Sequence, residues 1–527
     1  MPKLPSRPSR RPVSDNNAKP AGRKPPPLGA FPNTRQKPAS PYSGKKFEEA
    51  PEPAASKPST NFGGKTAGQP SGQRTSQVPQ TARPGQSARS AQTPRPTPSV
   101  QRSPAPVPPA VKLPVPCAMV SRRASEALRG GHLWVYASDI EQTEIGNGDA
   151  PGLIPVVDNR GIPLGTALYS PASQIALRLV SRELISRDQW HELLAMRLRT
   201  AIDRRKPMLS PETDACRLVF SEADALPGVI IDKYAGIVVL QLLNKGLDSA
   251  ETRAVCVKVL REALGDALRT IWERPDPRIR ELEGLSTPAT APLFSASETE
   301  PVAGTVFQLN GLSFHFDVNS GQKTGAFLDQ SQNYAAAARW AKARDVKKAL
   351  DVCTYQGGFA LHLAQFCEQV TGIDASRSSL EVAERNLELN RNHDRIPMSA
   401  EVDWLEADAF ELLRAWSESE EQAGWDMIVL DPPAFAKSKR AVEGALRGYK
   451  ELNLRALRMI RPGGLLVTCS CSHHVSWTDL EGAVAAAAVD AGRQVTLLER
   501  RGAALDHPVL LNLPETEYLK CLICQVD

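Results

Sequence analysis

The chain has 527 residues, which is too long for a single hydrophobic core and predicts several domains. Its net charge of +5 is unevenly spread: residues 1–110 hold 18 Lys and Arg against 4 Asp and Glu, a net +14, so residues 111–527 carry −9. Nine scattered cysteines, no apolar leader and no run of about 18 apolar residues argue against a secreted disulfide scaffold and a membrane-spanning protein. We therefore expect a soluble, cytoplasmic protein with reduced thiols.

The first 110 residues form a compositionally distinct segment that contains 24 of the 44 prolines. Large apolar residues are too few there to offset the entropy of ordering the chain, so residues 1–110 are predicted to be a disordered, basic, Pro-rich tail. Two roles stay open for this tail. It is either a cationic arm attracted to phosphate backbones or a solvated leader without a specific partner.

From Val111 onward the composition becomes that of folded domains. Short β-like runs predict a small, mostly β domain over residues 111–185. A central α+β domain is predicted over residues 186–300, from helices at 187–206 and 249–265 and strands within 217–243 and at 270–274.

Residues 301–527 begin with a hairpin at 305–318 and continue as alternating strands and helices. Continuous apolar runs are typical of strands buried on both faces of a parallel sheet. They occur at 347–353, 369–375, 402–408, 425–431, 464–470, 494–500 and 518–526. This alternation predicts a doubly wound α/β sheet that binds its ligand beyond the carboxyl ends of the strands.

Four acidic residues end four successive predicted strands, and in such a sheet all four would line one crevice: Asp351, Asp374, Asp408 and Asp431. The acid after the second strand can accept both hydroxyls of a ribose, and the acid after the third can accept from an adenine amino group. The loop CTYQGGF lacks the GxGxxG pattern of dinucleotide enzymes, and isolated acids could merely cap helices. The series favours S-adenosylmethionine as cofactor, held by Asp351, Tyr355, Gly357, Asp374, Asp408 and Asp431.

Two further motifs lie at adjacent strand ends, DPPAFAKSK at 431–439 and TCSCSHH at 468–474. A thiolate that adds to C6 of a pyrimidine makes C5 nucleophilic enough to accept a methyl group. Cys469 is the first choice of nucleophile and Cys471 the alternate, and both would point the same way on an extended strand. Asp431 would hydrogen-bond the base, and Phe435 would stack on it or pack as an ordinary loop aromatic.

Several polar residues near these motifs carry weaker expectations. Lys437, beside Lys439 and Arg440, either binds RNA phosphates or belongs to a solvated turn. His473 and His474 either position a substrate phosphate or cap the strand. Lys323 lies in GQKTG, whose spacing does not satisfy a P-loop, and it joins Phe435 and Lys437 as a substrate-binding candidate. The Cys-x-Cys spacing of TCSCSHH is not that of a zinc knuckle, so we expect no metal.

Four motifs taken together resemble those of the RlmI-type 23S ribosomal RNA cytosine-5 methyltransferases: DVNSGQKTGAFLDQ (317–330), DVCTYQGGFALH (351–362), DPPAFAKSK (431–439) and CSCSHHV (469–475). The resemblance extends over about four fifths of the chain and excludes the tail. It implies a PUA-like RNA-binding domain at 111–185, an EEHEE-type central domain, a Rossmann-like catalytic domain at 301–527 and one catalytic cysteine in TCSCS. The chain departs from the family at Gln356, where members usually read SYTGGF.

The resemblance also implies large-subunit ribosomal RNA as the partner. A homodimer stays possible, and we expect no membrane partner because no run of about 18 apolar residues occurs. Two other functions stay open. One is a base-nitrogen RNA methyltransferase, whose DPP loop and aromatic need no thiol, and Cys469 argues against it. The other is a non-catalytic RNA-binding or ribosome-assembly protein, against which the intact cofactor acids argue.

Overall fold

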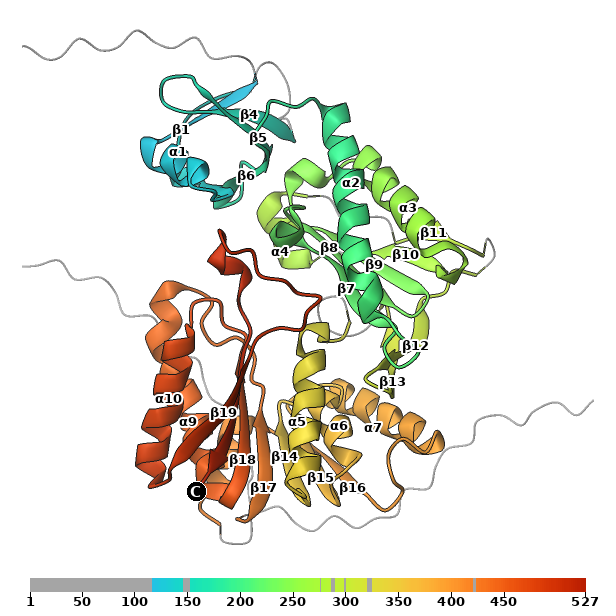
Figure 1. Ribbon diagram of the computed structural model, residues 1–527, viewed down its shortest axis with the longest axis vertical. Helices are drawn as coiled ribbons and strands as arrows, with labels where there is room; N and C mark the ends of the chain where they lie inside the picture. Colours follow the sequence, from blue (N-terminus) through green and yellow to red (C-terminus); the bar gives the residue numbers. More distant parts are fainter. Residues whose placement is uncertain are drawn as a thin grey trace, which may run out of the picture. The chain divides into compact units, whose positions relative to one another are not determined.

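The computed structural model describes residues 116–145, 152–274, 276–285, 290–297, 300–319, 325–419 and 423–527. The predicted tail over residues 1–110 and the substrate candidate Lys323 lie outside the described residues. Four β-sheets organise the described part, and they follow one another along the chain (Figure 1).

The first sheet has six strands in the order β2-β6-β5-β4-β1-β3. Alternating apolar residues, among them the fully buried Ile154, Val156 and Leu177, form its core. The helix α1 begins after Ser121, whose side chain accepts a hydrogen bond from the backbone N–H of Ala124. The bounds are β1 Cys117–Val120, α1 Arg122–Arg129, β2 Trp134–Tyr136, β3 Ile140–Glu144, β4 Leu153–Val157, β5 Pro163–Tyr169 and β6 Ile175–Ser181.

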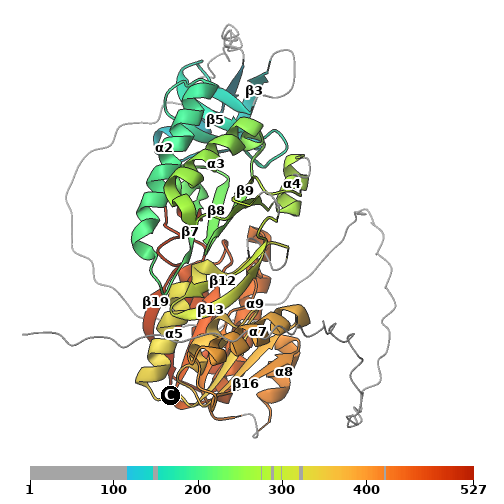
Figure 2. The same cartoon turned by 90° about the vertical axis from the view of Figure 1, so that its right-hand side faces the viewer.

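The second sheet has five strands in the order β11-β10-β9-β8-β7. Helices α2 and α3 lie side by side against it (Figure 2). Helix α2 opens with a capping box made by Ser186 and Gln189. The bounds are α2 Arg187–Arg205, β7 Ala215–Phe220, β8 Val229–Tyr234, β9 Ile237–Leu242, α3 Ala250–Leu264, β10 Thr270–Glu273, α4 Pro277–Glu283 and β11 Phe294–Ser295.

A two-stranded hairpin, β12 (Gly304–Leu309) and β13 (Leu312–Asp317), joins this sheet to the next. Phe316 of the hairpin stacks on Tyr234 of β8 with 4.0 Å between ring centroids, and Phe307 meets the same ring edge-on. These aromatic contacts bury the hairpin in the core that also underlies the last sheet.

The last sheet has seven strands in the order β16-β15-β14-β17-β18-β20-β19. The first five are parallel and β20 is antiparallel to both of its neighbours. Helices α5, α6 and α7 pack on one face, and α8, α9 and α10 pack on the other. The bounds are α5 Ser331–Ala343, β14 Lys348–Val352, α6 Gly358–Ala364, β15 Gln369–Asp374, α7 Arg377–Asn392, β16 Glu401–Glu406, α8 Ala409–Trp416, β17 Trp425–Leu430, α9 Val442–Met459, β18 Ile460–Ser470, α10 Trp477–Ala491, β19 Val495–Arg501 and β20 Lys520–Val526.

All seven strands expected in this region form, and the predicted α/β class is confirmed. The chain reverses its direction of winding between β14 and β17, and a ligand is expected beyond the carboxyl ends of the strands at such a point. Among the described residues, no helix combines the length and apolar character needed to span a bilayer.

Candidate active site

A cavity of about 820 Å³ lies at the carboxyl ends of β14, β15 and β17. Its lining includes the acids Asp374, Asp408 and Asp431, together with Tyr355 and Cys471. A volume of this size holds a cofactor or a ligand of comparable size.

The loop after β14 bends sharply beside this cavity. Cys353, Tyr355 and Gly357 all have positive φ angles, of 65°, 52° and 85°. A left-handed backbone is costly at the cysteine and the tyrosine, so the loop must be held by its contacts. One such contact is the backbone N–H of Tyr355, which donates to Asp374 Oδ2 at 2.9 Å. The acid after the second strand therefore also shapes the loop after the first.

Asp351 does not line the cavity, although the strand-end pattern places it with the other acids. It is fully buried, one residue before the end of β14, and its Oδ2 accepts hydrogen bonds from Thr354 Oγ1 at 2.6 Å and Ala360 N at 2.9 Å. Burial raises the pKa of Asp351 to about 7. Through these contacts Asp351 joins the loop after β14 to the first turn of helix α6.

Asp374 and Asp408 face the cavity while satisfying backbone donors. Asp374 Oδ1 accepts from Ser376 N at 2.8 Å, and Asp408 Oδ1 accepts from Phe410 N at 2.9 Å and Glu411 N at 3.0 Å, which caps α8. Asp408 is thus both a helix cap and a cavity residue, two roles that the sequence pattern presents as alternatives. Small and apolar side chains beside these acids, Ile373, Ala375 and Ala409, also line the cavity.

The glycine pair in this loop is required for two different reasons. Gly357 has a positive φ, whereas a Cβ on Gly358 would lie 2.5 Å from Cζ of the buried Tyr334. We expect Gly358→Ala to lower the free energy of unfolding by about 1–3 kcal/mol, because the ring cannot move away without strain. Gly482→Ala in α10 is the matched control, since a Cβ there meets no atom within 4 Å. Thermal denaturation should show a lower melting temperature for Gly358→Ala and no decrease for Gly482→Ala. Equal melting temperatures of the two variants would contradict this account.

Asp431 is held by a short chain of amides that the sequence analysis did not single out. Gln330 Nε2 donates to Asp431 Oδ1 at 2.9 Å, and Asn333 Nδ2 donates to Gln330 Oε1 at 2.7 Å. Both amides are buried; Gln330 is the last residue of GAFLDQ (325–330), and Asn333 follows three residues later. The orientation of the Asp431 carboxylate is therefore set from outside the DPPAF loop.

The two candidate cysteines occupy different environments. Cys469 is fully buried in β18, directly opposite Cys521 of β20, and burial raises the pKa of its thiol well above the usual range. Cys471 lies beyond the end of β18 and lines the cavity, with Sγ 3.9 Å from the carbonyl oxygen of Pro432. The expectation that both point the same way does not apply, because the strand ends at Ser470, between them. The geometry favours the alternate, Cys471.

Only some of the residues expected to bind the substrate lie in the lining of the cavity. Phe435 lines the cavity and lies between Phe410 and Tyr449, with ring centroids 5.7 and 4.8 Å away. Lys437 is exposed and is not part of the lining. His473 lines the cavity with its ring 5.3 Å from that of Tyr518, whereas the exposed His474 does not.

The first and second sheets supply the wall of the cavity that faces the cofactor acids from the other domains. Trp134 of β2 lines it and donates through Nε1 to Glu222 Oε1 at 3.0 Å. Arg217 of β7 lines it as well and forms an ion pair with Asp232 at 2.8 Å. The sequence carries no local signal for these residues, because each becomes part of the site only when three domains pack together.

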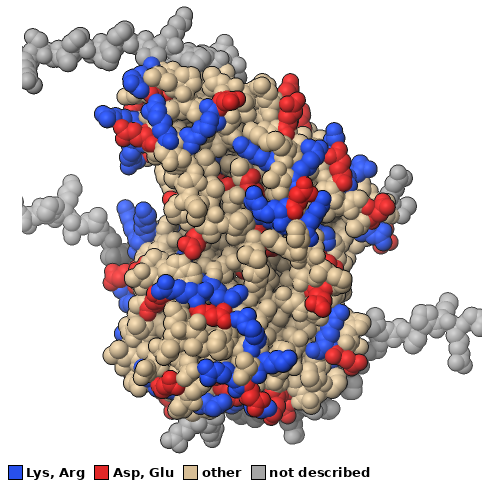
Figure 3. All heavy atoms as spheres, in the orientation of Figure 1, with Lys and Arg blue, Asp and Glu red and all other residues tan. Residues whose placement is uncertain are grey.

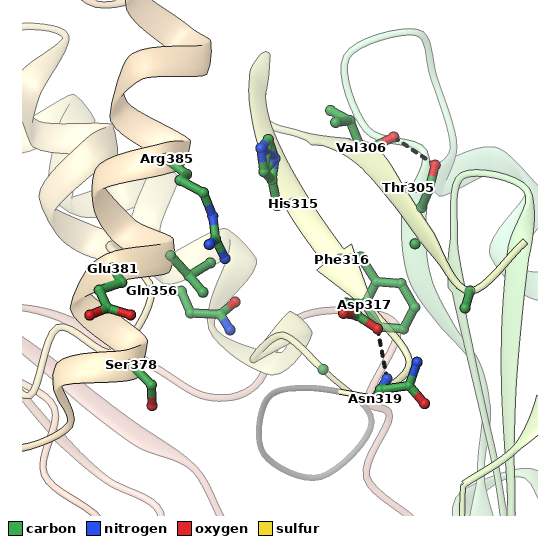
Figure 4. A pocket seen from close by; sticks show the side chains of 14 residues that line it. Thr305, Val306, His315, Phe316, Asp317, Asn319, Gln356, Ser378, Glu381 and Arg385 are labelled. Atoms are coloured by element: carbon green, nitrogen blue, oxygen red, sulfur yellow. Dashed lines mark hydrogen bonds between the residues drawn. The ribbon is translucent and has the colours of Figure 1, made fainter. Parts of the chain in front are cut away.

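Gln356, the departure from the family pattern, does not line this cavity. It lines a second one, of about 730 Å³, between the β12–β13 hairpin and α7 (Figure 4). There it lies near Arg385 and His315, and its carbonyl oxygen accepts from Asn386 Nδ2 at 3.1 Å. The substitution therefore leaves the lining of the larger cavity unchanged.

Charges of both signs are mixed on the face seen in Figure 3, where Lys and Arg are interspersed with Asp and Glu. In the first domain, Arg123 pairs with Asp139 at 2.7 Å, and Arg129 and Arg160 both pair with Asp158. Among the described residues, no cluster of His, Cys, Asp and Glu suited to a metal ion occurs.

Comparisons with known proteins agree with this architecture. Residues 119–182 match the family model of the PUA-like domain, and residues 237–499 match that of S-adenosylmethionine-dependent methyltransferases. In solved structures, the fold resembles a methyltransferase from Streptococcus mutans (TM-score 0.63, 20% identity, 78% of this chain and 99% of that one). A methyltransferase in complex with SAH has a similar fold (TM-score 0.64, 20% identity, 78% and 99%). The fold and site define an S-adenosylmethionine-dependent methyltransferase with a PUA-like domain.

Curated relatives identify the family within this class. The chain is 36% identical to "Ribosomal RNA large subunit methyltransferase I" of Pseudoalteromonas translucida over 409 residues, which is 76% of this chain and 97% of the relative. It is 33% identical to the protein of that name from Enterobacter sp. (strain 638), over 77% of this chain and 98% of the relative. The chain therefore belongs to the ribosomal RNA large subunit methyltransferase I family, as the resemblance implied.

Proposed function

We propose that this protein methylates C5 of a cytosine in large-subunit ribosomal RNA through a covalent bond between Cys471 and C6 of the base. The observation that carries the proposal is that the Cys471 thiol lines the same cavity as the cofactor acids, Asp431 and Phe435. The choice of RNA rests on the names of the relatives, which act on the large ribosomal subunit. Trp134 of the PUA-like domain lines the same cavity and supports an RNA that touches both domains.

The proposed reaction uses the thiolate as a temporary substituent on the base. Cys471 Sγ adds to C6, and the electron pair of the C5–C6 double bond becomes available at C5. Bound S-adenosylmethionine supplies an electrophilic methyl group on its sulfonium. After C5 has taken this methyl group, loss of the C5 proton to solvent restores the double bond and expels the thiolate. Asp431 binds the polar edge of the base during these steps, and Phe435 supports its face.

A buried cation supports Cys471 as the thiolate. Lys520, at the start of β20, is 3% exposed, and its Nζ donates to the carbonyl oxygens of Ser472 and Tyr518, both at 3.0 Å. These two carbonyls flank the Cys471 loop. Burial lowers the pKa of Lys520, and its electrostatic interactions with Glu517, Cys471 and Asp479 oppose that shift. A positive charge at this position favours the negative form of a neighbouring thiol.

Removing this charge should therefore shift the reactivity of Cys471 to higher pH. We expect Lys520→Met to raise the midpoint of iodoacetamide alkylation at Cys471 by about one pH unit, since a nearby cation commonly shifts a titration by that amount. Lys520→Arg should restore most of the profile. Lys450→Met, which removes a surface lysine paired with Asp490, is the control. Alkylation is followed by mass spectrometry of the Cys471 peptide, and an unchanged midpoint in Lys520→Met would contradict the proposed role.

The function itself is tested with RNA that carries 5-fluorocytosine. Fluorine at C5 replaces the proton whose loss releases the enzyme, so the reaction should stop at a methylated adduct joined to Cys471. Peptide mapping of the trapped complex identifies the cysteine. An adduct at Cys469 would reverse the assignment. Methyl transfer to a nitrogen of the base without an adduct would favour the base-nitrogen alternative.

A further inference from the structure

The connection between β19 and β20 contains a tight turn at residues 510–513. Leu513 N donates to the Leu510 carbonyl oxygen at 2.9 Å, and Leu510 N donates to Thr516 Oγ1 at 2.8 Å. Thr516 N in turn donates to the Leu513 carbonyl oxygen at 3.0 Å. Leu511 lies at the corner of this turn and is 93% exposed. A large apolar side chain is thus held in solvent by a hydrogen-bonded backbone.

This turn lies at the rim of the active-site cavity. Glu515 and Thr516, a few residues after Leu511, are part of the cavity lining. Asn512 Nδ2, next to Leu511, donates to the Gly131 carbonyl oxygen of the PUA-like domain at 2.5 Å. Figure 1 shows the connection, coloured red, leaving the carboxyl end of the sheet toward that domain. The turn therefore lies between the catalytic cavity and the domain expected to hold RNA.

An exposed leucine needs no explanation by itself, because folded proteins expose many apolar atoms. Val489, on the outer face of α10, is 80% exposed and touches nothing of the site. Leu511 differs in two respects, its hydrogen-bonded support and its place at the rim. Leu505 and Val509, on the same connection, are also exposed, which makes this segment apolar as a whole.

A base within structured RNA must leave its stack to reach an enclosed nucleophile, and the unstacking costs a few kcal/mol. Proteins that unstack nucleic acids commonly insert an apolar side chain into the gap. We propose that Leu511 enters the base stack of the substrate RNA at the position vacated by the target cytosine. This inference rests on the proposed function and adds the step that delivers a paired base to Cys471.

The test compares two RNAs that carry the same target sequence, one with the target cytosine in a hairpin stem and one with it unpaired. For Leu511→Ala we expect kcat/KM to fall about tenfold or more on the stem, since part of the unstacking cost is no longer offset, and to change less than about twofold on the unpaired RNA. Leu511→Met should retain most activity on the stem. Val489→Ala is the control with a similarly exposed side chain.

A binding measurement tests the insertion of Leu511 into the base stack, here called the wedge, independently of catalysis. With 2-aminopurine beside the target cytosine of the stem, binding of the full-length protein should raise the fluorescence, and Leu511→Ala should not. Equal losses of kcat/KM on both RNAs, or equal fluorescence of both proteins, would overturn the wedge. If the wild type raises the fluorescence but transfers no methyl group to either RNA, the wedge stands and the proposed function fails instead.

Discussion

Cys471→Ala is expected to abolish methyl transfer, whereas Cys469→Ala is expected to keep activity within about fivefold of the wild type. Loss of an enzyme nucleophile commonly costs about 10³-fold or more in kcat. Cys471 lines the cavity, whereas the thiol of Cys469 is fully buried in the core, and burial raises its pKa. Transfer of labelled methyl groups from S-adenosylmethionine to ribosomal RNA measures both variants.

Stability must be followed in parallel, because Cys469 is part of the buried core. Removing its sulfur should lower the free energy of unfolding by about 1–2 kcal/mol, as expected for a small cavity. Cys471→Ala should change stability less, since its side chain is only partly buried. An inactive but folded Cys469→Ala, together with an active Cys471→Ala, would return the role of nucleophile to Cys469.

Asp374→Asn is expected to weaken S-adenosylmethionine binding by about 10²-fold. The carboxylate of Asp374 accepts the backbone N–H groups of Tyr355 and Ser376 and faces the cavity where the ribose hydroxyls would bind. An amide turns one of these acceptor oxygens into a donor, and each lost hydrogen bond to a charged group costs about 1.5–3 kcal/mol. Because Tyr355 has a positive φ, losing its hydrogen bond also loosens the cofactor loop.

Isothermal titration with S-adenosylhomocysteine measures this effect without requiring RNA or turnover. Asp403→Asn is the matched control, because Asp403 is an exposed aspartate on the edge strand β16 and does not line the cavity. We expect wild-type affinity for Asp403→Asn. Unchanged affinity in Asp374→Asn would mean that the cofactor does not bind at the end of β15.

The order and type of elements could be predicted from the chain because they depend on short-range patterns. The continuous apolar runs that end at Asp374 and at Asp431 marked the buried parallel strands. Asp408 lies two residues beyond the end of β16 instead of at the predicted strand end, and the sequence pattern left capping and ligand binding as alternatives for it. In the structure one oxygen caps α8 while the residue still lines the cavity.

Residues that reach the site from other domains could not be found in this way. Trp134 lies in the first sheet and Arg217 in the second, and nothing in their neighbouring residues signals a cavity. Their roles follow from packing between segments far apart in the chain, such as the hydrogen bond from Trp134 to Glu222. Only a folded chain brings such groups within reach of one ligand.

The sequence by itself determined that the chain ends in a doubly wound sheet with acids after its strands and a cysteine pair after the fifth, because strand periodicity and the order of motifs are local properties. Tertiary structure decided which of these side chains meets a ligand. Cys469 is buried in the core that also contains residues of α5 and α6, and the end of β18 at Ser470 leaves Cys471 in the lining of the cavity. Asp351 is likewise buried, one residue before the end of β14. Exposure depends on where a strand stops and what packs against its faces, and both are properties of the assembled fold.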